Sequence, residues 1–183
     1  MTMLVFLLEE PSAREMLQAI MPRLLPDTDF LCIVFKGKQD LEKQLSPKLR
    51  GWLVPDSRFI VLRDQDSGDC MKIKVHLQNL CEQAGRNDAL IRIACRELES
   101  FYLGDLTAVE KGLGLTGLAP LQNKAKFRDP DHLENPSMEL IALTNKYYQK
   151  VSGSRAIAPH LDLVANRSVS FNNLISGIRS LQP

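Results

Sequence analysis

The chain has 183 residues, with 23 basic and 22 acidic side chains, 44% hydrophobic residues, and ten residues each of glycine and proline. This composition is close to the average of globular domains, which excludes a disordered, collagen-like or disulfide-scaffold protein. The formal net charge of +1 gives no overall attraction to nucleic acid or to an acidic membrane, so a polyanion would have to meet a local basic patch.

The four cysteines are far apart in the sequence, form no C-x-x-C pair and have no histidine at zinc-finger spacing. We therefore expect neither a zinc site nor a disulfide. The apolar run at residues 3–8 is too short for a signal peptide or a membrane span. These features together predict a cytoplasmic protein without a membrane partner.

The first hundred residues alternate short apolar runs with segments of helical period, a pattern typical of a parallel sheet with crossover helices. Each run is apolar on both faces, as in strands that helices cover on both sides. The sequence therefore predicts an α/β, Rossmann-like fold with a four-stranded, mainly parallel sheet in which the first strand is central. The predicted strands are residues 3–8, 30–35, 58–63 and 90–95.

Three helices are predicted between these strands. Ser12 and Glu15 form a capping box at the start of the first helix. Leucines at four-residue spacing mark the second helix, which ends before Gly51, and the third runs from Cys70 to near Gly85.

The alternation stops after Glu97, and the sequence predicts a sheet domain at residues 1–105 with a helical extension at residues 106–183 packed on it. We expect a turn at residues 152–155. The helices predicted after residue 97 are near residues 98–103, 106–111, 136–150 and 171–181.

Acidic residues follow three of the four predicted strands. The carboxyl ends of parallel strands meet at one edge of the sheet, where ligands bind in open α/β folds. Two of the acids, Asp64 and Asp66, are two residues apart and would face one site on an extended chain. Crowded carboxylates without His or Cys indicate a Mg²⁺ or Mn²⁺ site. The acids are Glu9, Glu10, Asp64, Asp66, Glu97 and Glu99.

Several of these residues also have a simpler interpretation. Glu10 and Glu99 suit the first turn of a helix, where the macrodipole favours acids. Lys38, after the second strand, is either a phosphate ligand or a solvated lysine. Arg155 and Arg167 are phosphate-binding candidates, with the alternative that they pin the last helix onto the sheet.

A glutamate after the first strand and an Asp-x-Asp after the third resemble the TOPRIM domain of topoisomerases, primases and OLD-type nucleases over residues 1–105. The whole chain is similar to a bacterial family of small TOPRIM-like proteins of unknown function, often encoded beside an AAA/ABC-type ATPase. The stretches that carry the resemblance are Glu9-Glu-Pro-Ser12, Gly37-Lys-Gln-Asp40, Arg63-Asp-Gln-Asp-Ser-Gly-Asp-Cys70, Arg96-Glu-Leu-Glu99, Leu103-Gly-Asp105, Gly153-Ser-Arg155 and Asn166-Arg-Ser-Val-Ser-Phe171.

The resemblance implies a Mg²⁺ (or Mn²⁺) site that uses Glu9, Asp64 and Asp66, with Glu9 as a general acid or base in phosphodiester chemistry. The chain departs from the TOPRIM pattern after the first glutamate. The position that is glycine in many TOPRIM proteins is acidic here, and the acid that OLD-type nucleases have four residues on is replaced by Ala13. The candidates for the missing ligand or catalytic acid are Glu10 and Glu97.

Two functions from different classes remain open. The first is a Mg²⁺-dependent phosphodiester-acting enzyme, a nuclease on DNA or RNA that acts with an ATPase partner in phage defence. The second is a non-catalytic adaptor whose TOPRIM-like fold binds a partner protein or a nucleotide, which the near-neutral charge and the incomplete acid pattern favour. A receiver domain ranks below both, because it requires a lysine after the last strands, where this chain has Arg96 and Glu97.

Overall fold

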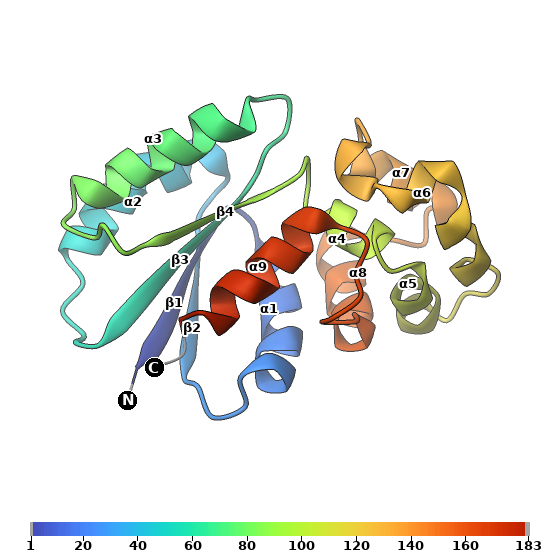
Figure 1. Ribbon diagram of the computed structural model, residues 1–183, viewed down its shortest axis with the longest axis horizontal. Coiled ribbons are helices and arrows are strands. Elements are labelled where there is room, and N and C mark those ends of the chain that lie inside the picture. The colour runs from blue at the N-terminus through green and yellow to red at the C-terminus, as the bar shows by residue number, and fades with distance from the viewer. Residues whose placement is uncertain (1, 182–183) are drawn as a thin grey trace.

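The computed structural model describes residues 2–181. Four parallel strands form one sheet in the order β2-β1-β3-β4, with helices on both sides (Figure 1). Each predicted strand is present within one residue of its expected bounds, and β1 lies inside the sheet, so the predicted fold class is confirmed. The strands are β1 (Met3–Leu8), β2 (Phe30–Val34), β3 (Ser57–Asp64) and β4 (Leu90–Ala94).

Side chains that alternate along β1 divide the core into two layers. Leu4, Phe6 and Leu8 pack on one face of the sheet, and Val5 and Leu7 pack on the other. All five are buried, which explains why the run is apolar at every position. The first face is covered by α1 (Pro11–Leu24) and α9 (Val169–Arg179), and the second by α2 (Lys38–Arg50) and α3 (Cys70–Glu82).

The helices at residues 99–160, between β4 and α9, lie beside the sheet and are called the extension from here on (Figure 1). One hydrophobic cluster runs from the α1 face of the sheet into the extension. The helices of the extension are α4 (Glu99–Leu103), α5 (Leu106–Leu113), α6 (Ala125–Arg128), α7 (Pro136–Leu143) and α8 (Lys150–Ile157), with short 3₁₀ helices at Ala119–Asn123, Pro130–His132 and Ala158–His160.

The prediction of a single helix at residues 136–150 is wrong. The structure ends α7 at Leu143, and Asn145 and Lys146 adopt left-handed backbone angles, with φ of 51° and 66°. A right-handed helix cannot continue through two such residues. The chain therefore turns here and delivers the next segment back toward the sheet.

The turn expected at residues 152–155 is also wrong, because these residues lie inside α8. Gly153 packs directly against the ring of Tyr148, where a Cβ atom would collide. Glycine and serine in this segment therefore allow a close approach inside a helix. Helix α8 places Lys150 and Arg155 on the α1 side of the sheet, where Lys150 contacts Glu10, directly before α1, and Arg155 contacts Glu15 of α1.

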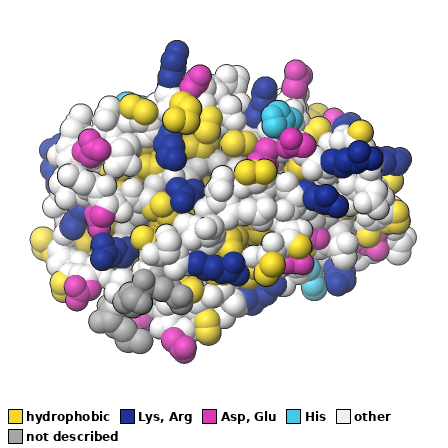
Figure 2. All heavy atoms as spheres, viewed as in Figure 1, with side chains coloured by type: hydrophobic (Ala, Val, Ile, Leu, Met, Phe, Trp, Pro, Cys, Tyr) yellow, Lys and Arg dark blue, Asp and Glu magenta, His cyan; other side chains and the backbone are white. Residues whose placement is uncertain are grey.

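On the face shown in Figure 2, basic and acidic side chains are interspersed over both the sheet and the extension. Within residues 2–181, no helix has both the length and the apolar character needed to cross a membrane.

Candidate functional site

Glu9 and Asp64 meet at the carboxyl edge of the sheet. Strands β1 and β3 are neighbours, with Leu8 opposite Leu62, so the residues that follow them emerge side by side. The Oε2 atom of Glu9 accepts a hydrogen bond from the backbone N–H of Asp64 at 3.1 Å. The order of strand and acid in the sequence thus corresponds to a direct contact in the fold.

Asp64 is the last residue of β3, and only 7% of its surface is exposed. Burial raises the pKa of its carboxyl group well above the usual value, and the nearby charges of Glu10, Glu99 and Glu9 raise it further. A buried carboxylate surrounded by like charges is unfavourable in the absence of a cation. A cation beside Asp64 would therefore stabilise its ionised form.

Glu9 is half-buried and has charged groups of both signs nearby. Burial raises the pKa of Glu9, the hydrogen bond from the Asp64 backbone opposes this shift, and the charge of Asp66 reinforces it. The Arg63 guanidinium lies 3.9 Å from Glu9 Oε2 but makes its closer ion pair with Glu42, at 2.9 Å. Glu9 thus keeps a carboxylate that is only partly neutralised.

Asp66 does not share the orientation that an extended chain would give it. Strand β3 ends at Asp64, and Asp66 has a left-handed φ of 54°. Its carboxylate pairs with Lys38 Nζ at 2.8 Å and is 35% exposed. The structure therefore brings Asp66 and Lys38 together at the rim of the edge, and Asp64 alone of the two aspartates is buried.

Glu10 lies directly before α1 and accepts two contacts. Its Oε1 atom accepts a hydrogen bond from Ser12 Oγ at 2.6 Å, and its Oε2 atom is 3.3 Å from Lys150 Nζ. The predicted capping box is wrong: α1 begins at Pro11, so Ser12 is inside the helix. Glu15 instead pairs with Arg155 at 2.7 Å, and this pair joins α8 to α1.

Glu99 is a buried acid whose role the sequence did not reveal. It is the first residue of α4 and is 0% exposed. Its Oε1 atom accepts a hydrogen bond from Tyr148 Oη at 2.9 Å and lies 3.9 Å from Lys150 Nζ. Its Oε2 atom is buried without a hydrogen-bond partner among the described residues. Burial raises the pKa of Glu99, and Lys150 opposes that shift.

Glu97 and Arg155, two further candidates from the sequence, are engaged elsewhere. Glu97 Oε2 accepts a hydrogen bond from the backbone N–H of Ser137 at 2.7 Å, at the start of α7. Arg155 is held by Glu15. The structure thus uses both residues to connect elements, and it does not draw them into the contacts around Asp64.

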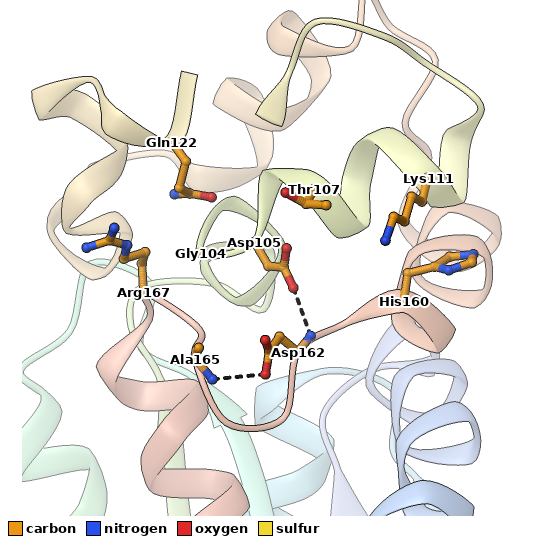
Figure 3. A pocket seen from close by; sticks show the side chains of 9 residues that line it. All are labelled: Gly104, Asp105, Thr107, Lys111, Gln122, His160, Asp162, Ala165 and Arg167. Carbon is orange, nitrogen blue, oxygen red and sulfur yellow. Dashed lines mark hydrogen bonds between the residues drawn. The ribbon is translucent and has the colours of Figure 1, made fainter. Parts of the chain in front are cut away.

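Arg167 lines a separate hollow of about 360 Å³ in the extension (Figure 3). Lys111 and His160 also line it, together with Asp105 and Asp162. The two aspartates bind backbone N–H groups, since Asp105 accepts from Asp162 at 2.8 Å and Asp162 accepts from Ala165 at 3.0 Å. None of the acids at the edge of the sheet lines this hollow, so Arg167 is placed apart from them.

Residues 8–179 match the family described as "Domain of unknown function (DUF4276)". The chain belongs to this family. No curated protein is similar to it in sequence.

Two solved structures resemble this DUF4276 chain in fold. One is the C-terminal region of the OLD protein of Xanthomonas campestris pv. campestris, with 13% identity and a TM-score of 0.53 over 97% of this chain and 94% of the other. The other is the C-terminal region of the OLD protein of Burkholderia pseudomallei, with 17% identity and a TM-score of 0.57 over 98% of each chain. At these identities the likeness establishes a shared fold.

The acids of the DUF4276 chain fit a hard divalent cation in chemistry but are not assembled around one point. Within residues 2–181, no three His, Cys, Asp or Glu side chains are grouped closely enough to form a metal centre. The edge nevertheless offers only oxygen ligands, which Mg²⁺ and Mn²⁺ prefer. Glu99 carries a buried oxygen without a partner among the described residues, and burial, together with the charges of Glu10, Glu99 and Glu9, raises the pKa of Asp64. Glu9, Glu10 and Asp64 would hold the ion, with Asp66 and Glu99 beside them.

Proposed function

We propose that the chain is a Mg²⁺-dependent phosphodiester-acting enzyme, a nuclease on DNA or RNA. The strongest support comes from the surroundings of Asp64. Its backbone N–H donates to Glu9 Oε2, and its carboxyl group is buried. Burial and the charges of Glu10 and Glu99 raise the pKa of this group. Structural ion pairs and caps normally lower the pKa of an acid. A buried acid with a raised pKa beside other acids is typical of a site that binds a cation or transfers protons.

The charged residues at the edge match the groups that phosphodiester cleavage requires. Bound Mg²⁺ would supply Lewis-acid chemistry at the phosphate. Glu9 is our candidate for the group that takes a proton from the attacking water, because a carboxylate with a raised pKa is a better base near neutral pH. Lys38 stands at the same edge and would neutralise charge on the phosphate.

An ATPase partner and a role in phage defence belong to this proposal through the family resemblance. The shared fold with the C-terminal regions of OLD proteins supports the proposed nuclease, but it specifies neither a partner nor a biological role. Neither enters the chemistry of the edge itself.

The proposal is tested by incubating the purified chain with single-stranded DNA, double-stranded DNA and RNA in Mg²⁺ or Mn²⁺. We expect cleavage of at least one substrate that chelation abolishes. Glu9→Gln, which removes our candidate general base, should reduce the rate by at least about a hundredfold, the scale of losing a catalytic acid or base. Asp64→Asn, which removes a candidate ligand of the ion, should reduce the rate as well. The matched control is Asp88→Asn, which removes an exposed aspartate paired with Arg58 at 2.8 Å, and it should cleave like the wild type.

The non-catalytic adaptor is the second candidate, and one observation favours it: within residues 2–181 the acids do not form a ready metal group, and lysines already neutralise Glu10 and Asp66. The same preparation separates the two functions. If the wild type neither cleaves nucleic acid nor binds Mn²⁺, the enzyme is excluded and the adaptor is favoured.

A further inference from the structure

We propose that Lys150 is an internal counter-cation that occupies the acidic edge in the metal-free protein and that a divalent ion displaces. This inference rests on the proposed metal site and adds to it a residue that sets its affinity. Lys150 bridges two acids from distant parts of the chain, with Nζ 3.3 Å from Glu10 Oε2 and 3.9 Å from Glu99 Oε1.

The position of Lys150 in its helix is unfavourable on local grounds. Lys150 is the first residue of α8, and the positive end of the helix dipole disfavours a cation there. The compensation comes from tertiary contacts. The Nζ atom lies beside carboxylate oxygens of Glu10 and Glu99, which belong to other parts of the chain. Lys150 is therefore held by the acidic edge and not by its own helix.

The neighbours of Lys150 are arranged to fix it over the acids. Tyr148 Oη donates to Glu99 Oε1, and the Tyr148 ring is packed against Gly153 of α8. Glu99 is thus fixed by Tyr148 through one oxygen, and its second oxygen has no partner within the described residues. The Lys150 side chain remains 46% exposed, so its flexible stem can swing into solvent when another cation takes its place.

The Lys150 ammonium group occupies the space beside Glu10 and Glu99. Each acid has one oxygen near the ammonium group, while Glu10 Oε1 accepts a hydrogen bond from Ser12 Oγ and Glu99 Oε1 also accepts one from Tyr148 Oη. A divalent ion at the same place would meet repulsion from the lysine. Binding of the ion and retention of Lys150 at the edge therefore exclude each other.

The test is a titration of the full chain with Mn²⁺, followed by the electron paramagnetic resonance signal of free Mn²⁺, at about pH 8, above the usual range of carboxyl pKa values. We expect Lys150→Met to bind Mn²⁺ at least about fivefold more tightly than the wild type, the lower end of typical coupling between two ligands. Lys150→Arg, which keeps the charge, should bind like the wild type.

The matched control is Lys126→Met. Lys126 pairs with Glu139 at 2.7 Å, away from the edge acids, and its side chain is 51% exposed, close to the value for Lys150. This variant should leave Mn²⁺ affinity unchanged. Circular dichroism checks that each variant is folded, and Lys150→Gln replaces Lys150→Met if the latter does not fold.

The outcomes separate this inference from the proposed function. If the wild type binds Mn²⁺ and Asp64→Asn does not, but Lys150→Met and Lys150→Gln bind no more tightly than the wild type, the counter-cation is refuted and the metal site stands. If no variant and no wild-type sample binds Mn²⁺, both proposals fail together. Tighter binding by Lys150→Met with an unchanged Lys126→Met supports the inference.

Discussion

At the scale of single residues, Asp64 is the group whose chemistry differs most from that of an ordinary surface acid. It is buried and lies among Glu9, Glu10 and Glu99. Because its pKa is raised in the folded state, the folded protein holds this proton more tightly than the unfolded chain. The resulting stability is fully present below the unfolded pKa and is lost as the pH rises through the folded pKa.

We therefore predict that Asp64→Asn stabilises the metal-free protein at neutral pH. The amide has nearly the same shape and carries no charge, so the cost of the buried carboxylate is removed. The free energy of unfolding should rise by more than about 1 kcal/mol, and its decline between acidic and neutral pH should become shallower. Urea denaturation at several pH values measures both effects.

The control for this prediction is Asp88→Asn, an exposed aspartate whose replacement should change the free energy of unfolding by less than about 0.5 kcal/mol. An Asp64→Asn variant that is less stable than the wild type at neutral pH, with an unchanged pH profile, would show that the Asp64 carboxylate is compensated by contacts we have not assigned.

The residues of the site differ in how far they could be predicted. Glu9 and Asp64 follow buried strands, and the adjacency of β1 and β3 brings them together. Glu99 and Lys150 could not be assigned in this way, because their contacts join residues 49 and 140 positions apart, to Tyr148 and to Glu10 respectively. The signal available for Glu99 was an acid at the start of a segment that is otherwise apolar.

At the scale of elements, the turn after α4 shows how the extension is attached. Gly104 follows α4, and its carbonyl accepts a hydrogen bond from the Arg167 N–H at 2.9 Å. The Asn166 side chain bonds the Phe101 carbonyl at 2.9 Å and the Ser168 N–H at 2.8 Å. These contacts hold the start of α9 against the end of α4.

Gly104→Ala should therefore destabilise the protein by about 1–3 kcal/mol, the range for overpacking a close contact. A Cβ atom at this position would lie 2.7 Å from the Ser168 N atom and would also collide with Asn166. Gly104 has an ordinary φ of −75°, so the cost comes from crowding and not from backbone strain. Thermal and urea denaturation of the variant measure it.

Gly85→Ala serves as the comparison for this prediction. Gly85 has a left-handed φ of 74° with open space around it, so its replacement should cost about 1–2 kcal/mol through the backbone alone. If Gly104→Ala is as stable as the wild type, the contact between α4 and the start of α9 is looser than the structure indicates.

The elements of the sheet were predictable because each strand is an apolar run bounded by polar residues and buried on both faces. Helix α8 was not, because Gly153 and two serines have the composition of a turn. Only the packing of Gly153 on Tyr148 explains a helix there. The break between α7 and α8 likewise depends on two left-handed residues, Asn145 and Lys146, which no periodic pattern marks.

At the scale of the whole molecule, a chain with net charge +1 has to bring a polyanion to an acidic edge through local cations. Lys38 is already at the edge. Arg155 lies on α8 beside α1, and Arg167 lies in the separate hollow of the extension. These two arginines remain our candidates for contacts with phosphates outside the reacting centre.

We predict that replacing both Arg155 and Arg167 by Ala weakens binding to nucleic acid and makes its dependence on salt shallower, because fewer counterions are released. Mn²⁺ affinity should not change, since neither residue contacts the edge acids that would hold the ion. Fluorescence anisotropy with labelled DNA and RNA across a salt series measures the slope. A double variant with unchanged binding and a lower melting temperature would assign both arginines to packing.

The most direct measurement of the central claim is a crystal structure with Mn²⁺ at millimolar concentration, in which anomalous scattering locates the ion. We predict an anomalous peak between Glu9 and Asp64 at the carboxyl edge of the sheet, with Lys150 moved away from Glu10 and Glu99. A fully ordered edge without a peak, with Lys150 still between these two acids, would contradict the metal site and with it the proposed nuclease.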